Sequence, residues 1–400
     1  MSAMAGGKRS VEEHAAHVAK LLAAVRSGTR VRIPLSRALH RALAESLDAP
    51  IDLPPFRNSQ MDGYAVDSAS VATVPVTLTV RGVLAAGDGR AEHEPGTALK
   101  IMTGAPIPDG ADAIVPVEDT EADKRAGTVT VHRTAPAGAY VREAGSDIRT
   151  GDPLLPAGTV LAARHIAALA AVGVTDVFVH ARPRVAVIST GSELVPAGDA
   201  LAPGKIYNSN GPALAASAIA NGADVVSIDH SDDDPDGFAE MLAHAVAVAD
   251  VVFTSGGVSR GDFEVVKDTL EPRGGEFLSV AMQPGGPQGT AVVDGIPVLA
   301  FPGNPVSALV SFEMFARPAL REASGLPAVE YEDRPLTRDL TSISGKRQLL
   351  RGRRDGTGVA PASGHGSHLV AGMATADVLI DIPADTTSLK TGDLVKVIPL

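Results

Sequence analysis

Polar and glycine-rich loops follow four apolar segments in the middle of the chain. Ligands of open α/β sheets bind beyond the carboxyl ends of the strands, so four such loops on one edge predict one shared site. The loops are Thr190-Gly191-Ser192-Glu193, Ser231-Asp232-Asp233-Asp234, Ser255-Gly256-Gly257-Val258-Ser259 and Pro302-Gly303-Asn304-Pro305.

The loop at 255–259 carries free backbone N–H groups and two hydroxyls just before an expected helix. Such an arrangement suits a phosphate or another oxyanion. A tight strand-to-helix turn explains the same residues without any ligand. The acidic loops on the same edge shift the balance towards binding.

Three acidic residues, Glu193, Asp233 and Glu264, are expected around this ligand. Carboxylates repel a phosphate unless a divalent cation lies between them, and a ligand set of oxygens alone favours Mg²⁺. The run 232–234 also precedes Pro235, so it could simply cap the next helix. Capping by one Asp leaves the others available to a metal.

The turn at 302–305 has two explanations that the sequence leaves open. Asn304 is suited to an N-cap and Pro305 to the first residue of a helix. A stiff loop at a strand end could equally form one wall of a pocket. The segments 58–66 and 101–106, judged locally, are typical of structural turns.

Apolar runs of strand length at 185–189, 224–229, 250–254 and 297–301 alternate with segments of helix length. This alternation predicts βαβ units and a parallel, doubly wound sheet that helices cover on both faces. The expected helices lie at 210–221, 236–249, 264–270 and 306–323.

Outside this domain, the pattern predicts a small β domain at about 56–140, inserted into a first domain that contains helices at 11–25 and 164–172. His14 and His17 on the first helix are expected to be an exposed pair. After about residue 326, short apolar runs separated by Gly turns predict a small β-barrel or sandwich.

Composition excludes several classes of function. The absence of Cys rules out disulfides, a thiolate nucleophile and a zinc–cysteine site. A net charge of −12 and 3% aromatic residues argue against nucleic-acid binding. No signal peptide or membrane span is visible, which predicts a cytoplasmic protein that binds a small molecule or another protein.

Eight segments, in order, resemble the molybdopterin molybdenumtransferase family (MoeA and the gephyrin E domain) across almost the entire chain. The resemblance implies four parts: an elongated first domain (1–55 and 141–181), an inserted β domain (56–140), a MogA-like molybdopterin-binding α/β domain (182–326) and a C-terminal β-barrel (327–400). It also implies a homodimer with a shared cleft. The segments are NSQMDGYAV, IMTGAPIPDGADAIVPVED, GSDIRTGDPLLPAGT, RPRVAVISTGSELV, IYNSNGPAL, TSGGVSRGDFEVVK, FPGNPVSALVSFEMF and SGHGSHLVAGMATADVLI.

The family implies a transferase of molybdenum-cofactor biosynthesis that inserts molybdate into adenylylated molybdopterin, with Mg²⁺-dependent release of AMP. It also implies a molybdopterin adenylyltransferase as a partner. The residues expected to be catalytic are Asp62, Thr103, Glu193, Asp233 and Glu264, and of these Glu193, Asp233 and Glu264 are also the expected metal ligands. The residues expected to bind molybdopterin are Ser255, Gly256, Gly257, Ser259, Pro302, Gly303, Asn304 and Pro305. Arg351 and Ser367 are expected to contact molybdate or another oxyanion.

Two departures from the family pattern matter. Glu264 stands where relatives commonly have Asp. Ser279, Gln283 and Gly286 occupy positions where many relatives carry lysines, a loss that should weaken oxyanion capture and for which Arg260 could compensate. The alternatives are a divergent paralogue with weak activity or another oxyanion preference, such as tungstate, and a non-catalytic molybdopterin-binding scaffold.

Overall fold

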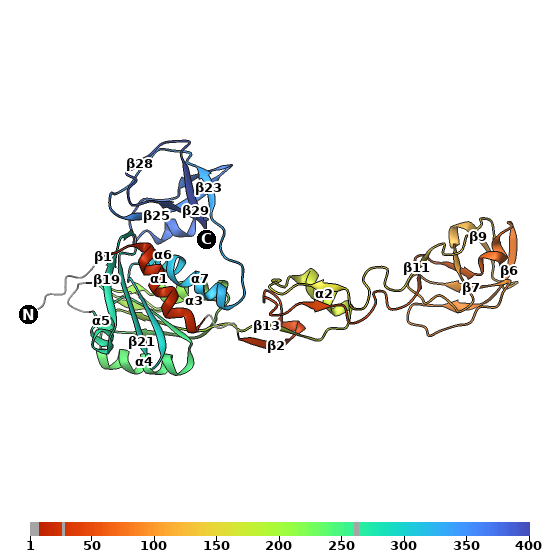
Figure 1. The fold of residues 1–400 in the computed structure, drawn as a ribbon, viewed down its shortest axis with the longest axis horizontal. Helices are drawn as coiled ribbons and strands as arrows, with labels where there is room; N and C mark the ends of the chain where they lie inside the picture. The colour runs from red at the N-terminus through yellow and green to blue at the C-terminus, as the bar shows by residue number, and fades with distance from the viewer. Residues whose placement is uncertain (1–7, 26–28, 260–263) are drawn as a thin grey trace, which may run out of the picture. The chain divides into compact units, whose positions relative to one another are not determined.

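The computed structural model describes residues 8–25, 29–259 and 264–400 (Figure 1). The chain divides into two compact units. The first unit contains Met1–Arg32, Arg41–Ala44 and Phe178–Leu400, and the second contains Ile33–His40 and Glu45–Val177. Each unit has its own sheets and its own buried clusters.

A seven-stranded sheet is the centre of the first unit. Its last four strands, β22, β18, β14 and β17, are parallel, which confirms the predicted parallel arrangement for this part. β21 runs antiparallel to its two neighbours, β22 and β19. The strands β19 and β21 were not predicted. The order is β1 (Lys8–Arg9), β19 (Glu276–Val280), β21 (Pro287–Val293), β22 (Ile296–Phe301), β18 (Val251–Ser255), β14 (Arg184–Thr190) and β17 (Asp224–Ser231).

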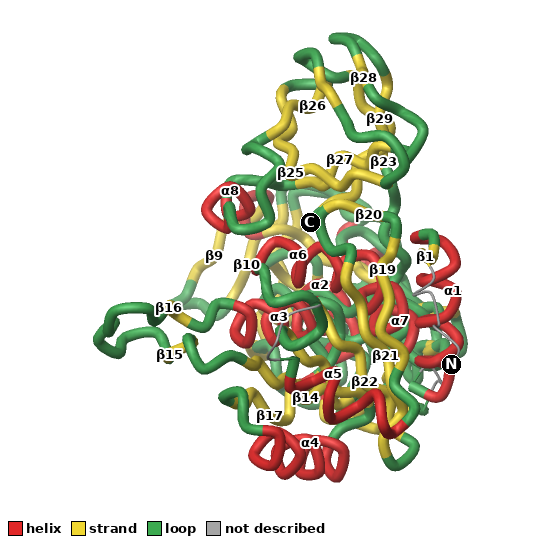
Figure 2. The backbone as a smooth tube through the Cα atoms, turned by 90° about the vertical axis from the view of Figure 1, so that its left-hand side faces the viewer, coloured by secondary structure: helices red, strands yellow, loops and turns green. Residues whose placement is uncertain are grey.

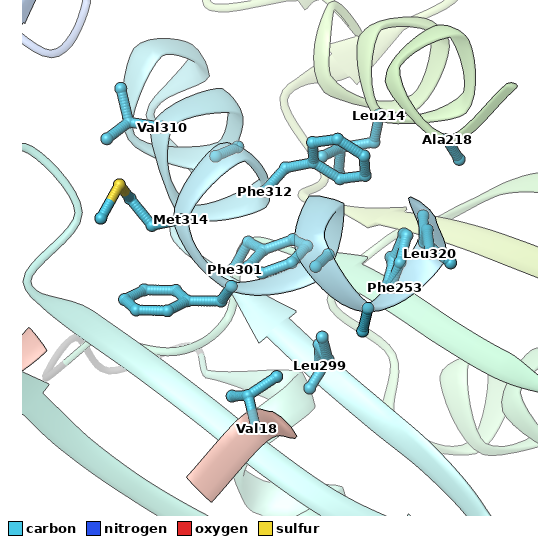
Figure 3. Close-up of a cluster of buried hydrophobic side chains, with 14 of the residues drawn as sticks. Val18, Leu214, Ala218, Phe253, Leu299, Phe301, Val310, Phe312, Met314 and Leu320 are labelled. Atoms are coloured by element: carbon cyan, nitrogen blue, oxygen red, sulfur yellow. The ribbon is translucent and has the colours of Figure 1, made fainter. Parts of the chain in front are cut away.

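Alternate residues of the central strands point to opposite faces, so each face packs its own helices. Val187, Phe253 and Phe301 belong to one buried cluster, and Ile188 and Val252 belong to another. Figure 3 shows Phe253, Phe301 and Phe312 in the first cluster. The first face packs α1 (Val11–Leu21), α3 (Asn210–Ala220), α6 (Pro305–Ser311) and α7 (Arg317–Ala323), and the second packs α4 (Pro235–Val248) and α5 (Val265–Leu270) (Figure 1).

Helix α1 corrects one expectation, because His14 is buried at 2% exposure. Val11, His14 and Val18 form the buried stripe of this helix, at the spacing of one helical face. The His14 ring meets that of Phe315 edge to face at 4.6 Å between centroids. Phe315 lies in a π-helical segment, Phe312–Ala316, that separates α6 from α7 where one continuous helix was predicted.

The C-terminal part of the first unit contains a second sheet with its own core, as expected of a small β domain (Figure 2). The short strand β20 (Met282–Gln283) pairs in parallel with β25, which links this sheet to the α/β part. The further strands of this second sheet are β25 (Arg347–Asp355), β27 (Val378–Ile382), β29 (Leu394–Pro399), β23 (Glu332–Pro335) and β26 (Gly358–Pro361). A separate pair is formed by β24 (Leu340–Thr341) and β28 (Ser388–Leu389), and the helix of this part is α8 (Val370–Ala374).

The second unit contains a six-stranded sheet within the predicted β insertion. Its order is β8 (Ala113–Pro116), β5 (Gly63–Val66), β7 (Thr97–Ile101), β6 (Val76–Leu84), β10 (Thr128–Val131) and β9 (Thr120–Asp123). Two short strand pairs belong to the rest of this unit: β4 (Asn58–Ser59) pairs with β11 (Val141–Arg142), and β3 (Leu47–Asp48) pairs with β12 (Pro153–Leu155). Helix α2 (Ala163–Ala171) follows β12 in the chain. A third pair, β2 (Arg30–Pro34) with β13 (Asp176–His180), lies where the chain passes from one unit to the other.

The fold class is confirmed as α/β and β multidomain, whereas the bounds of the four domains stay a prediction. Within the described ranges, no helix combines the length and the apolar character needed to span a membrane.

Candidate active site

A cavity of about 930 Å³ lies at the carboxyl ends of the parallel strands. All four predicted loops contribute to its wall. Of the predicted site residues, those that line it are Glu193, Asp233, Gly256, Gly257, Ser259, Glu264, Pro302, Gly303, Asn304 and Pro305. The structure therefore brings together residues that are more than 100 positions apart in the sequence.

The loop after β18 is both a tight turn and part of the cavity wall. The N–H of Gly256 donates to the carbonyl of Phe301 at 3.1 Å, which fixes the loop against β22. Gly256 has a φ of +97°, and a Cβ there would lie 2.6 Å from Thr190 Oγ1, so only glycine fits. Ser255 is buried beneath this turn at 1% exposure and does not line the cavity.

The acidic loop after β17 resolves the two explanations that the sequence left open. Asp234 caps α4, because its Oδ2 accepts from the N–H of Gly237 at 3.1 Å and Pro235 is the first helical residue. Asp233 instead lines the cavity, where its Oδ2 accepts from the N–H of Ser192 at 3.2 Å. One Asp thus starts the helix while its neighbour faces the site.

The three predicted metal-binding carboxylates differ in exposure. Glu264 is buried at 9% exposure, and its Oε2 accepts from the N–H of Ser259 at 2.8 Å. Asp233 is half-buried and Glu193 is exposed. In residues 8–25, 29–259 and 264–400, no group of three His, Asp or Glu side chains could hold a metal ion. The three carboxylates therefore do not form a metal-binding group by themselves, and the Mg²⁺ site stays a prediction.

The loop after β22 is tied to the start of α3. Asn304 is at the N-cap position and Pro305 is the first residue of α6, as the turn predicted, but the Asn304 side chain makes no capping hydrogen bond. The carbonyl of Gly303 accepts from Asn210 Nδ2 at 2.8 Å. This hydrogen bond joins two walls of the cavity.

Several cavity residues were not predicted as site residues. Tyr207, Asn208 and Asn210 reach the cavity from the end of β16 (Ile206–Tyr207), which pairs in parallel with β15 (Leu194–Val195), and from the start of α3. His368 reaches it from the C-terminal part of the unit. The signal was present in the sequence, because IYNSN leads into α3, whose first residue is Asn210, and His368 ends the SGHGSH segment.

In the second unit, Asp62 and Thr103 form a hydrogen-bonded pair. Asp62 Oδ1 accepts from the N–H of Thr103 at 2.7 Å and from its Oγ1 at 2.9 Å. The backbone and side-chain hydrogen bonds of Thr103 hold the pKa of Asp62 below its usual value. Both residues are exposed, so the carboxylate is ionised and open to solvent at neutral pH.

Comparison with known proteins identifies the family. Three family models match successive parts of the chain: the MoeA N-terminal region (domain I and II) at residues 9–173, a probable molybdopterin binding domain at 186–322 and the MoeA C-terminal region (domain IV) at 333–400. Molybdopterin molybdenumtransferase 2 of Mycobacterium tuberculosis is 44% identical over 411 residues, which cover 97% of this chain and 99% of that protein. The chain belongs to the molybdopterin molybdenumtransferase family.

Further relatives agree with this assignment. Molybdopterin molybdenumtransferase of Staphylococcus aureus (strain COL) is 33% identical over 384 residues, or 92% of this chain and 90% of that protein. A crystal structure of the molybdopterin biosynthesis MoeA protein from Pyrococcus horikosii matches 98% of this chain and 99% of that chain, with 33% identity and a TM-score of 0.78. The predictions of the family and of an enzyme of molybdenum-cofactor biosynthesis are confirmed.

Arg351, expected in this family to contact an oxyanion, is buried at 1% exposure and does not line the cavity. Its Nε donates to Ser363 Oγ at 2.8 Å, and its Nη2 donates to the carbonyls of Gly364 and Gly366. Burial lowers the pKa of the guanidinium. Arg351 thus holds the loop that leads to Ser367, whose carbonyl accepts from the N–H of Val306 at 3.2 Å.

The positions at which the family resemblance led us to expect lysine are neutral: Ser279 lies on β19, Gln283 on β20, and Gly286 directly before β21. Ser279 is exposed, and Gln283 Oε1 accepts from Gln348 Nε2 at 3.2 Å. Arg260, the expected compensating cation, lies outside the described residues. The described lining of the cavity includes Glu193, Asp233 and Glu264 but no Lys or Arg.

Proposed function

We propose that this enzyme transfers molybdate to adenylylated molybdopterin and releases AMP in a Mg²⁺-dependent reaction. The observation that carries the proposal is the cavity at the strand ends, where the glycine-containing turn at 256–259 and the carboxylates Asp233 and Glu264 line one space. Relatives along nearly the whole chain are named for this transfer.

Binding of the substrate is assigned to the two glycine-containing loops. The N–H groups of Gly256 and Ser259 donate to Phe301 and Glu264, so the turn at 255–259 would offer its remaining N–H groups and the Ser259 hydroxyl to the pterin phosphate. The loop at 302–305 forms the opposite wall, and Asn210 fixes its position through Gly303. A rigid wall orients the substrate before the reaction, which lowers the entropic part of the barrier.

Glu193, Asp233 and Glu264 are proposed to hold Mg²⁺ together with substrate phosphate oxygens. The cation would neutralise charge that develops as the phosphate–adenylate bond breaks. The hydrogen bonds from Ser192 to Asp233 and from Ser259 to Glu264 orient two of these carboxylates. No protein nucleophile is required, because the dithiolene sulfurs of the substrate capture the molybdenum.

The outer residues are proposed to complete the site in a cytoplasmic homodimer with a shared cleft. Asp62 is anchored by Thr103 and stays ionised, so it can orient a bound cation or water. Arg351 is proposed to act on the oxyanion through the loop that carries Ser367 and His368.

The test is an assay of AMP release. Purified chain is incubated with adenylylated molybdopterin and Mg²⁺, with molybdate present or absent, and the expected result is molybdate-dependent AMP and metallated cofactor. A parallel reaction with tungstate measures oxyanion preference, which the neutral Ser279, Gln283 and Gly286 leave open. Binding of the substrate without any oxyanion-dependent AMP release would instead favour the non-catalytic scaffold.

A further inference from the structure

A second recess adjoins the main cavity and has the opposite charge. It has a volume of about 390 Å³ and is lined by Val258, Ser259, Lys267, Phe277, Leu278, Ser279 and Pro287. Val258, Ser259 and Pro287 also line the main cavity, so the two spaces share a wall. We refer to this space as the lysine recess.

The backbone of Lys267 is held in place, and its ammonium has no partner among the described residues. Its backbone N–H donates to the carbonyl of Gly257 at 3.0 Å, which fixes the residue against the Gly-Gly turn. Lys267 is half-buried, and in the part of the chain that the structure describes its Nζ makes no hydrogen bond or ion pair. A half-buried ammonium without a carboxylate partner attracts an anion more strongly than an exposed, paired one.

The other polar groups of the recess also suit an oxyanion. The hydroxyls of Ser259 and Ser279 can donate hydrogen bonds, and the described residues that line the recess include no Asp or Glu. Glu264, which accepts from the N–H of Ser259, lines the main cavity instead. Among the described residues, the two neighbouring spaces therefore differ in charge, with carboxylates along the main cavity and a lysine along the recess.

We propose that Lys267, with Ser259 and Ser279, binds a tetrahedral oxyanion in the lysine recess. The oxyanion is either molybdate or a phosphate group of the pterin, since both offer several acceptor oxygens to an ammonium and hydroxyls. The identity of the ligand rests on the proposed function, but the binding itself does not. In this chain Lys267 supplies a positive charge for the oxyanion, which the neutral Ser279 and Gly286 cannot supply.

Gly286 offers an independent way to test the recess. A Cβ at Gly286 would have no neighbour closer than 3.6 Å and would lie 3.8 Å from Ser279 Oγ. A side chain at this position therefore fits and begins beside the recess. The substitution Gly286→Lys should add a second ammonium without disturbing the fold.

The experiment is equilibrium dialysis of the full chain against molybdate alone and against inorganic phosphate alone, at low ionic strength. Lys267→Gln should weaken binding about tenfold or more, as expected for loss of a charge-assisted hydrogen bond. Lys267→Arg should retain most of the affinity because the charge is kept. Gly286→Lys should tighten binding and should restore it in the Lys267→Gln chain.

The matched control is Lys124→Gln, because Lys124 is an exposed lysine of the second unit. Preference for molybdate would assign the recess to the metal oxyanion, and preference for phosphate would assign it to the pterin. Absence of binding to the natural chain, unchanged binding by Lys267→Gln, or equal loss in Lys124→Gln would overturn the proposal. If Lys267→Gln does not fold, the Gly286→Lys chain decides, since no gain in affinity would likewise overturn it. The dialysis contains no pterin, so its result does not depend on whether the chain releases AMP in the assay of the proposed function.

Discussion

The side-chain amide of Asn210 donates a 2.8 Å hydrogen bond to the carbonyl oxygen of Gly303. Asn210 is the first residue of α3, and Gly303 lies in the loop after β22. Gly303 also packs against Gly256, since a Cβ at Gly303 would lie 3.4 Å from the Gly256 Cα. One amide therefore positions a loop that touches the turn at 255–259.

Asn210→Ala should affect both stability and substrate binding. Loss of a buried hydrogen bond lowers the free energy of unfolding by about 1–2 kcal/mol, measured by denaturant titration with circular dichroism. The KM for adenylylated molybdopterin should rise because the 302–305 wall loses its anchor. Asn221→Ala is the control, because Asn221 is equally buried but contacts Arg317 and Arg321. A similar rise in KM for both variants would contradict the positioning role.

Asp62→Asn should abolish most turnover while the thermal melt changes little. Asp62 is exposed, and the Oδ1 of an Asn can still accept both hydrogen bonds from Thr103, so the substitution removes the negative charge and disturbs no core. The chain contains a matched control, because Asp52 accepts from the N–H and Oγ1 of Thr150, both at 2.8 Å, in the same unit. Asp52→Asn should leave AMP release unchanged. Equal losses of activity, or unfolding of the Asp62→Asn chain, would show that the pair is structural.

Asp233→Asn should raise the Mg²⁺ concentration required for half-maximal AMP release. Its neighbour provides the control, since Asp234 caps α4 and does not line the cavity. Asp234→Asn should leave the Mg²⁺ requirement unchanged, because Asn caps helices about as well as Asp. Chelation with EDTA should stop turnover in the natural chain, and added Mg²⁺ should restore it. If the two variants shift the Mg²⁺ titration equally, Asp233 is not a metal ligand.

Local patterns predicted the parallel strands because each strand is a short apolar run. They also predicted that the four loops after these strands line one site, because the carboxyl ends of parallel strands lie on one edge of the sheet. The strands β19 and β21 were missed because Pro284, Gly285 and Gly286 interrupt the apolar pattern between them. The polar Gln283 belongs to β20, which joins the second sheet by pairing with β25. This pairing is long-range in the sequence, so no local pattern could predict it.

Side-chain burial was harder to predict than the elements. Arg351 is fully buried because the carbonyls of Gly364 and Gly366 accept from its guanidinium, and those residues come from a loop outside its own strand. His14 was expected to be exposed because no further ligand was evident near the His14 and His17 pair, but the helix turns it towards Phe315 of the π-helical segment. In both cases distant partners decide the environment.

The burial of His14 should make the stability of the first unit depend on pH. Burial, followed by the nearby charges of Arg9 and His17, lowers the pKa of His14 from 6.5 to about 3. Between these two values the unfolded chain binds a proton at His14 that the folded chain does not, so the free energy of unfolding falls as the pH falls. At pH 5 this contribution amounts to about 2 kcal/mol relative to pH values above 7.

His14→Leu removes this titration and keeps an apolar side chain against Phe315, so its stability should fall less than that of the natural chain between pH 7.5 and pH 5. Denaturant titrations followed by circular dichroism at both pH values measure the difference. His244 is exposed on α4, and His244→Gln is the matched control that should retain the dependence of the natural chain. Parallel pH profiles for the natural chain and His14→Leu would mean that His14 is protonated in the folded state, which would contradict its neutral packing against Phe315.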